Sequence, residues 1–196
     1  MAVPSADPSA DPSADPSVDA SADPSAVRPP VTVEDATPGD WPRIAELTVG
    51  VYRDERLASD AYLPQLADVA GRAGRAQLVV ARDAGAVPAA APGAVVGAVA
   101  LVLAGDFGEV TRSPDEAAFR MLVVDPAVRG RGVGEALVRE CLTRARAAGR
   151  RRMVLSTGPQ MAAAHRLYDR LGFTRLPGRD WSPRPGIDLL VYALEL

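Results

Sequence analysis

Residues 121–134 read MLVVDPAVRGRGVG, and this stretch decides the fold. Its first four residues end an apolar run from Ala117, which predicts a buried strand that stops at Asp125-Pro126. After the glycines, apolar side chains recur at helical spacing from Val133 to Ala147, as in an amphipathic helix. The sequence therefore predicts a strand, a glycine-rich turn and a helix in direct succession.

The turn from Arg129 to Gly134 is suited to an anion. Backbone N–H groups at the start of a helix lack partners within it, and the helix dipole favours negative charge there. The glycines at 130, 132 and 134 permit positive φ and close approach of the backbone, and Arg129 and Arg131 add positive charge. We expect the turn to bind a phosphate or pyrophosphate. The alternative is that the turn is only a tight structural connection and binds no ligand.

Two common nucleotide motifs do not fit this turn. A P-loop needs Gly-Lys followed by Ser or Thr, and lysine is absent. The dinucleotide fingerprint needs a third glycine where Glu135 stands. The turn is therefore expected to bind a pyrophosphate of another kind.

The flanking sequence alternates strands with helices. Upstream and downstream of the turn we expect a strand at Val31–Val33, a helix at Trp41–Glu55, a helical segment at about Tyr62–Ala73, a hairpin of strands Gln77–Arg82 and Val95–Leu103, a strand at Arg152–Ser156, a helix at Pro159–Leu171, and terminal strands near Phe173 and at Ile187–Leu194. Most of these strands are apolar on both faces, which favours an α/β fold with helices over a central mixed sheet.

Composition excludes several classes of partner. The 196 residues carry 22 basic and 25 acidic side chains, a net charge of −3, so no general affinity for nucleic acid or an anionic membrane is expected. Cys141 is the single cysteine and lies among the apolar positions of a helix, as a core residue would.

No cluster of His and Cys has ligand spacing, so we expect no metal. Without a secretory signal at the start, the expected location is cytoplasmic.

The first 30 residues differ in composition from the rest. Residues 5–26 repeat Ser-Ala-Asp-Pro with almost no large apolar side chain, so we expect a disordered tail at 1–30 and a folded domain at 31–196. The simplest interpretation of the tail is a tolerated extension. The alternative is that its acidic repeats dock on a basic partner.

Two motifs in this order resemble the GNAT acetyltransferase superfamily. The pattern Arg129-x-x-Gly132-x-Gly134 resembles that family's acetyl-CoA signature, and residues 164–173, AHRLYDRLGF, resemble its later segment, in which a helix carrying a Tyr ends at Gly-Phe. The resemblance covers 31–196. It implies a splayed mixed sheet with helices on both faces and acetyl-CoA as cosubstrate.

The resemblance also implies roles for individual residues. The backbone of Leu122, Val123 and Val124 would pair with the pantetheine arm, and a N–H of Val123 or Val124 would polarise the acyl carbonyl. The pyrophosphate would be held by N–H groups of Arg129, Gly130, Arg131, Gly132, Val133 and Gly134. Tyr168 would protonate the leaving thiolate, with ordinary helix packing as the alternative. Met161 stands where many relatives carry an Asn that contacts the pantetheine.

The incoming amine must lose a proton, and Glu116 at the start of the central strand is our candidate base. The alternative for Glu116 is a solvated carboxylate beside Asp115. Asp106, Glu109 and Asp115 precede that strand and could attract a cationic amine or be simply solvated. Trp181 lies in a loop of turn-forming residues, where it could line an acceptor pocket or cover the edge of the core.

We therefore predict an N-acetyltransferase that moves an acetyl group from acetyl-CoA to a primary amine of a small molecule or peptide, by direct attack in a ternary complex. A catalytically inactive acyl-CoA sensor or regulatory module is the alternative. The chain is expected to act as a monomer or homodimer.

Overall fold

The computed structural model describes residues 31–85, 93–105 and 110–196. The predicted tail at 1–30 and the acidic residues Asp106 and Glu109 lie outside these ranges. The strands are β1 Val31–Asp35, β2 Gln77–Asp83, β3 Val95–Val102, β4 Glu116–Val124, β5 Arg152–Thr157, β6 Thr174–Arg175, β7 Trp181–Arg184 and β8 Ile187–Glu195. The α-helices are α1 Trp41–Asp54, α2 Leu63–Ala67, α3 Val69–Ala73, α4 Val133–Ala147 and α5 Ala162–Arg170.

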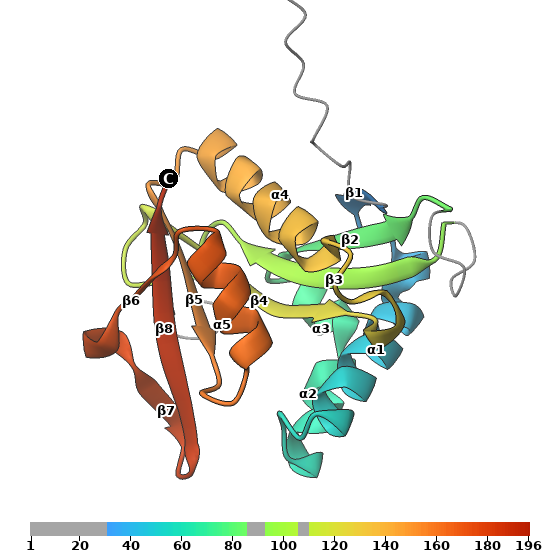
Figure 1. The fold of residues 1–196 in the computed structure, drawn as a ribbon, viewed down its shortest axis with the longest axis horizontal. Helices are drawn as coiled ribbons and strands as arrows, with labels where there is room; N and C mark the ends of the chain where they lie inside the picture. Colours follow the sequence, from blue (N-terminus) through green and yellow to red (C-terminus); the bar gives the residue numbers. More distant parts are fainter. Residues whose placement is uncertain (1–30, 86–92, 106–109) are drawn as a thin grey trace, which may run out of the picture.

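The strands form one open mixed sheet in the order β1-β2-β3-β4-β5-β8-β6, with β7 paired to β8 (Figure 1). β4 and β5 run parallel, and the other neighbouring pairs are antiparallel. The predicted hairpin of β2 and β3 is confirmed. The predicted α/β fold with a mixed sheet is also confirmed.

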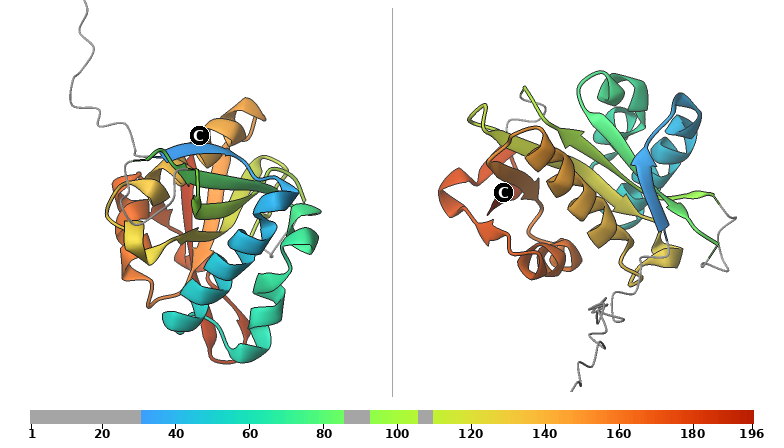
Figure 2. Two further views of the ribbon diagram at one scale, coloured as in Figure 1. Left: turned by 90° about the vertical axis from the view of Figure 1, so that its right-hand side faces the viewer. Right: turned by 90° about the horizontal axis from the view of Figure 1, so that it is seen from above.

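Helices cover both faces of the sheet (Figure 2). Successive side chains of a strand point to opposite faces, and β2 shows the result. Val79 and Ala81 pack in one core cluster with residues of α4, and Leu78 and Val80 pack in another with residues of α1 and α3. Cys141 is fully buried in the first cluster, as predicted.

Gly97 on β3 lets the start of α4 lie close to the sheet. A Cβ at Gly97 would stand 3.0 Å from Leu137 Cδ1, 3.1 Å from Val133 Cγ1 and 3.1 Å from the Val123 carbonyl oxygen. Such distances are tighter than ordinary van der Waals contact. The absence of a side chain at Gly97 of β3 therefore helps to place the N-terminal turn of α4 over β4.

Three predicted elements differ in detail. The segment 62–73 is two short helices, because Asp68 leaves helical geometry at ψ 76° and its Oδ1 accepts from the Gly71 N–H at 2.8 Å, which caps α3. The helix expected from Pro159 begins at Ala162, after a turn in which the Met161 N–H donates to the Gly158 carbonyl. β7 was expected to be loop; it forms an edge hairpin with β8 around Pro185-Gly186, where Pro183 is tolerated.

No helix within the described ranges is long and apolar enough to span a membrane.

Candidate active site

β4 and β5 separate part-way along their length. Their parallel pairing covers only Glu116 to Ala118 of β4 and Arg152 to Val154 of β5. Beyond this point β5 continues to pair with β8 as far as Thr157, and β4 continues to pair with β3 as far as Val124. The edge of β4 that faces β5 therefore has no strand partner from Phe119 onward among the described residues.

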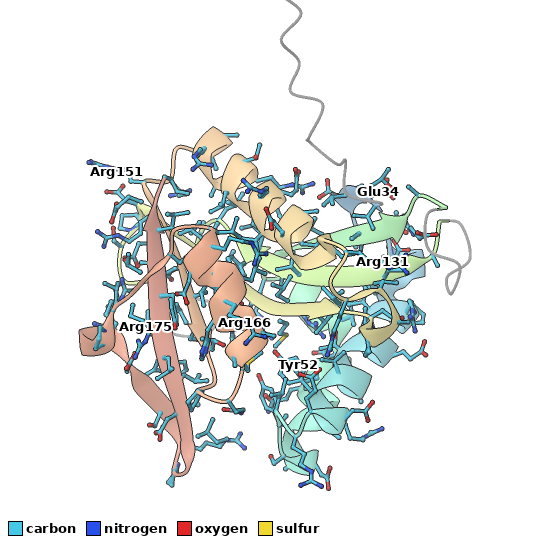
Figure 3. The ribbon with its side chains drawn as sticks, in the orientation of Figure 1. Glu34, Tyr52, Arg131, Arg151, Arg166 and Arg175 are labelled. Carbon is cyan, nitrogen blue, oxygen red and sulfur yellow. The ribbon has the colours of Figure 1, made fainter. Side chains whose placement is uncertain are left out.

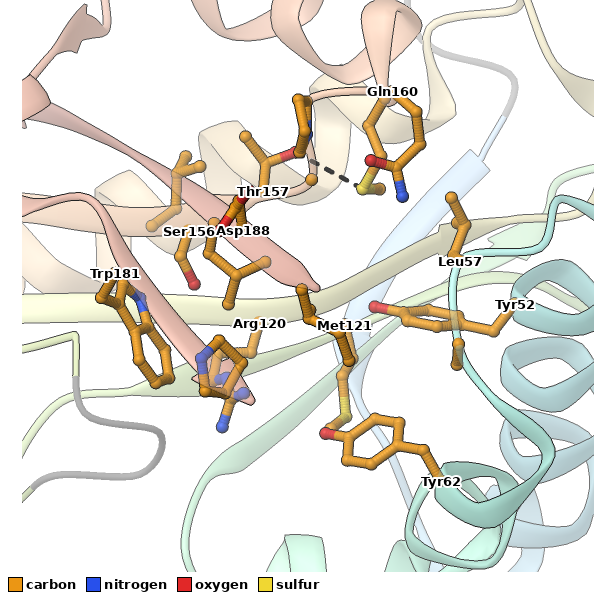
Figure 4. Close-up of a pocket in the computed structure, with 18 of the residues that line it drawn as sticks. Tyr52, Leu57, Tyr62, Arg120, Met121, Ser156, Thr157, Gln160, Trp181 and Asp188 are labelled. Atoms are coloured by element: carbon orange, nitrogen blue, oxygen red, sulfur yellow. Dashed lines mark hydrogen bonds between the residues drawn. The ribbon is translucent and has the colours of Figure 1, made fainter. Parts of the chain in front are cut away.

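A cavity of about 510 Å³ lies where the two strands separate. Its lining comes from the end of α1 and the residues after it, from β4, from the end of β5 through Met161, and from the β7–β8 hairpin, with Tyr168 added from α5. Figure 4 shows Tyr52 and Tyr62 on one side, Trp181, Ser156 and Asp188 on the other, and Met121 between the two sides. The volume is that of a small-molecule site.

A β-bulge in β4 lies beside this cavity. Ala98 pairs with Val123 and Ala100 with Arg120, so Met121 and Leu122 stand opposite the single residue Val99. Met121 has a φ of 51°, which is uncommon for a residue with a side chain. The extra residue reverses which side chains face α4 and α5. The bulge also turns the backbone of β4 just where the edge of that strand is open.

The glycine-rich turn begins α4 as predicted. Gly130 and Gly132 have φ of 77° and 80°, and Gly132 is the N-cap of the 15-residue helix. Arg129 is anchored: its Nη2 lies 2.5 Å from Glu55 Oε1, and its Nε donates to the Val124 carbonyl at 3.3 Å. These contacts tie the turn to Glu55, the residue after α1, and to the end of β4.

The predicted cofactor residues converge at this point. A Cβ on Gly134 would lie 3.6 Å from Val124 Cγ2 and 3.5 Å from Leu167 Cδ2, so the first turn of α4 touches both β4 and α5. Leu122 lines the cavity, whereas Val123 and Val133 are buried in the core. Figure 3 shows Arg131 near the N-terminal end of α4 and Arg166 on α5.

Glu135 in the first turn of α4 is neutralised by two arginines. Its Oε1 accepts from Arg139 Nη2 at 2.8 Å and its Oε2 from Arg170 Nη2 at 3.0 Å. The bonds from Arg170 and Arg139 hold the pKa of Glu135 below its ordinary value. The carboxylate thus links α4 to α5 and adds little net negative charge to the N-terminal end of α4.

Tyr168 joins the cavity to the aromatic core. The residue is 4% exposed, and its ring centroid lies 5.9 Å from Phe119, 5.8 Å from Phe173 and 5.9 Å from Tyr192. Burial, with smaller contributions from neighbouring tyrosines and Cys141, raises the pKa of the Tyr168 phenol. At neutral pH the hydroxyl is therefore protonated and available as a proton donor.

The structure does not bring Glu116 to the cavity. Glu116 belongs to the paired part of β4, roughly 10 Å along the strand before the first lining residue, Phe119. Its oxygens accept from Arg179 at 2.6 and 3.0 Å and from the Arg112 N–H at 2.8 Å. Burial raises the pKa of Glu116, but the bonds from Arg179 and Arg112 outweigh it, and the pKa is lowered.

Three further side chains have clear positions. Trp181 both lines the cavity and packs on the core cluster that contains Val154. Met161 lines the cavity, and its sulfur accepts from Thr157 Oγ1 at 3.4 Å. His165 Nε2 lies 3.1 Å from the Gly158 carbonyl, and its ring stacks on Tyr192.

Sequence reasoning missed Tyr52, Tyr62 and Arg120, which also line the cavity. Arg120 carried a signal, because it is the one charged residue in the apolar run from Ala117 to Val124. Tyr52 and Tyr62 carried none, since each fits an ordinary amphipathic helix. Their approach to β4 depends on how α1 and α2 pack.

Comparison with known proteins identifies the family. The sequence model described as "Acetyltransferase (GNAT) family" matches residues 41–173, from the start of α1 to Phe173. The chain belongs to the GNAT acetyltransferase family. A comparison with curated proteins finds no match.

Solved GNAT structures share this fold. A GCN5-related N-acetyltransferase from Kribbella flavida has a TM-score of 0.65 and 25% identity, over 85% of this chain and 98% of that one. A GNAT-family acetyltransferase from Staphylococcus aureus Mu50 has a TM-score of 0.63 and 15% identity, over 85% and 99%. The yncA protein of Salmonella typhimurium, described with its cofactor acetyl-CoA, has a TM-score of 0.57 and 23% identity, over 85% and 94%.

Proposed function

We propose that the protein transfers an acetyl group from acetyl-CoA to a primary amine of a small molecule or peptide, by direct attack within a ternary complex. One observation carries the proposal: the open edge of β4 leads from the cavity to the positive-φ glycine turn at the start of α4. An open strand edge followed by such a turn suits a ligand with an amide-bearing arm and a pyrophosphate end.

The backbone supplies most of the binding. The unpaired edge of β4 at Leu122, Val123 and Val124 would hold the pantetheine amides as an added strand does. The N–H groups of Arg129 to Gly134 would hold the pyrophosphate at the helix N-terminus. Gly130 and Gly132 support this role, since both have positive φ and no atom lies within 4 Å of an added Cβ at either, which leaves room for a ligand against the backbone.

Two groups of the chain would assist the chemistry. When bound, acetyl-CoA supplies the thioester carbonyl that the amine attacks. A fixed N–H of Val123 or Val124 would polarise that carbonyl without reorganisation. The phenol of Tyr168 would hold the proton that the departing thiolate requires. The position of Tyr168 at the cavity supports this role, and its hydroxyl is protonated at neutral pH, as an ordinary phenol is.

Glu116 does not line the cavity, so we look for the acceptor of the amine proton among the residues that do. Asp188 is the only carboxylate among the described residues that line the cavity. Its Oδ1 accepts from Ser182 Oγ at 2.6 Å, which fixes the carboxylate at the start of β8. We assign proton acceptance to Asp188, directly or through water, and a structural role to Glu116.

The test is release of CoA thiol from acetyl-CoA in the presence of a panel of amines, with mass spectrometry of the acetylated product. Amine-dependent thiol release from the full chain, retained when residues 1–30 are removed, is the expected result. Tight acetyl-CoA binding without release for any amine would favour the sensor alternative. Loss of function on removal of the tail would favour the docking role for its acidic repeats.

A further inference from the structure

The cavity is positively charged although the chain is not. The chain carries a net charge of −3, yet the cavity is lined by three arginines, Arg56, Arg120 and Arg184, and by the single carboxylate of Asp188. A concave site lined with one sign of charge concentrates ligands of the opposite sign. The acceptor part of the cavity is thus unsuited to polycationic amines and suited to an anion.

Arg120 is the arginine most fixed by the fold. It lies in β4 one residue before the bulge, between the buried Phe119 and Met121. Burial, reinforced by Tyr62 and opposed by Arg120 and Arg72, raises the pKa of Tyr52 to about 12. Arg120 and Tyr52 line the same cavity, as Figure 4 shows. At neutral pH Tyr52 is a neutral hydroxyl that can donate into this cavity.

Trp181 adds a donor that has no acceptor within the described part of the chain. Its indole Nε1 is buried and has no hydrogen-bond partner among the residues that the structure describes. Trp181 lines the same cavity, and Figure 4 shows its ring on the side that carries Ser156 and Asp188. Buried N–H groups in native structures almost always have an acceptor, so a ligand oxygen here would satisfy an otherwise costly group.

We propose that the amine acceptor carries an oxyanion, as an α-amino acid does, and that Arg120 binds this oxyanion, with the Trp181 N–H and the Tyr52 hydroxyl, on opposite sides of the cavity, as further donors to the acceptor. The inference rests on the proposed function and names its substrate class. A guanidinium matches the geometry of a carboxylate better than any other side chain. Asp188 completes the fit, since a zwitterionic amine needs one anionic group for its ammonium. The volume of about 510 Å³ suits a free amino acid or a close relative.

The test compares matched acceptors on the full chain at saturating acetyl-CoA. The probes are the common L-amino acids and their C-terminal amides, taurine and 2-aminoethylphosphonate as other oxyanions, and spermidine and kanamycin as polycations. We expect kcat/KM for the best carboxylated amine to exceed that of its amide by roughly 10- to 100-fold, the value of a charge-assisted contact. The taurine and aminoethylphosphonate arms show which oxyanion is preferred. The inference would be overturned if an amide had the same kcat/KM as its parent amino acid, or if a polycation had a kcat/KM as high as the best carboxylated amine.

Variants assign the effect to Arg120. Arg120→Gln should raise KM for the carboxylated acceptor by roughly 10- to 100-fold, abolish the preference over the amide, and leave acetyl-CoA affinity unchanged. Trp181→Phe keeps an aromatic side chain but removes the N–H and part of the ring surface, and should weaken binding of the acceptor alone. Arg146→Gln, at an exposed position in the last turn of α4, is the control. It should change neither the binding of the acceptor nor the affinity for acetyl-CoA. An Arg120→Gln enzyme with the acceptor preference intact would overturn the assignment.

A binding measurement separates this inference from the proposed function. Calorimetry with the CoA-bound protein should detect the amino acid in the wild type and not in Arg120→Gln, even where no turnover occurs. Failure of the proposed function would appear as absence of acetyl-CoA binding to the wild type. In that case, titration of the amino acids into the protein alone tests whether Arg120 binds them. Absence of Arg120-dependent binding of any of these oxyanions would overturn the inference.

Discussion

Glu116 and Arg179 are joined by two hydrogen bonds: Nη1 donates to Oε1 at 2.6 Å and Nη2 to Oε2 at 3.0 Å. Their side chains are only 4% and 14% exposed. The same Arg179 donates to the Val110 carbonyl, so the pair fastens the segment before β7 to the start of β4. β7 and β8 supply one wall of the cavity, and this ion pair therefore supports the site from outside it.

Removing the Glu116 carboxylate should reduce stability and leave chemistry nearly intact. Glu116→Gln leaves the buried Arg179 without a countercharge, and we expect a loss of about 3 kcal/mol in the free energy of unfolding at pH 7. Catalysis should fall by less than about 3-fold, since a missing general base costs on the order of 100-fold or more. Urea denaturation and steady-state kinetics measure the two effects. A large fall in kcat with stability unchanged would restore Glu116 as the base.

The same pair gives a pH dependence with a definite sign. The pKa of Glu116 is lowered from its ordinary 4.5, so its contribution is complete above pH 4.5 and is lost as pH falls through the lowered folded value. The stability difference between the wild type and Glu116→Gln should thus be constant near neutral pH and shrink below 4.5. Denaturation curves across this range test it; a difference that grew on acidification would contradict the ion-pair account.

Loss of the Tyr168 hydroxyl should slow turnover. Tyr168→Phe keeps the aromatic packing but removes the proton donor, so kcat should fall by roughly 10²- to 10⁴-fold with acetyl-CoA binding unchanged. Tyr192→Phe is the matched control, because Tyr192 belongs to the same aromatic cluster but does not line the cavity. Equal effects of the two substitutions on kcat would show that Tyr168 contributes packing alone.

Two glycines should respond in opposite directions. At Gly97 an added side chain meets α4 and the β4 backbone, so Gly97→Val should cost about 1–3 kcal/mol of stability. Gly50 lies within α1 with no atom within 4 Å of an added Cβ, so Gly50→Ala should stabilise by about 0.5–1 kcal/mol. Thermal denaturation measures both; a stable Gly97→Val protein would show that α4 can move away from the sheet without cost.

The fold could be predicted because its signals are local. An apolar run, two positive-φ glycines and an amphipathic helix suffice to predict β4, the turn and α4, and Gly132 has the conformation expected for it. Asp68 shows the limit: one residue outside helical geometry divides a segment whose spacing looked continuous. β7 was missed because its Pro183 and the following Pro-Gly resemble loop, whereas pairing with β8 decides its structure.

The site was only partly predictable, because much of it is long-range. The bulge places Met121, a non-glycine residue, at positive φ. Tertiary contacts impose this conformation, and no local sequence pattern predicts it. Glu116 was chosen for its place at a strand start, but its environment is set by Arg179, which lies 63 residues away. Tyr52 and Trp181 reach one cavity from opposite ends of the chain.

Binding of acetyl-CoA to the glycine turn is the central claim, and calorimetry on three proteins tests it. Gly132→Val strains the turn at the start of α4, where φ is 80°, and Gly149→Val places the same strain just after the end of the same helix, where φ is 70°. We predict tight binding by the wild type and by Gly149→Val, and at least about tenfold weaker binding by Gly132→Val. No binding by the wild type, or equal binding by all three, would contradict the account.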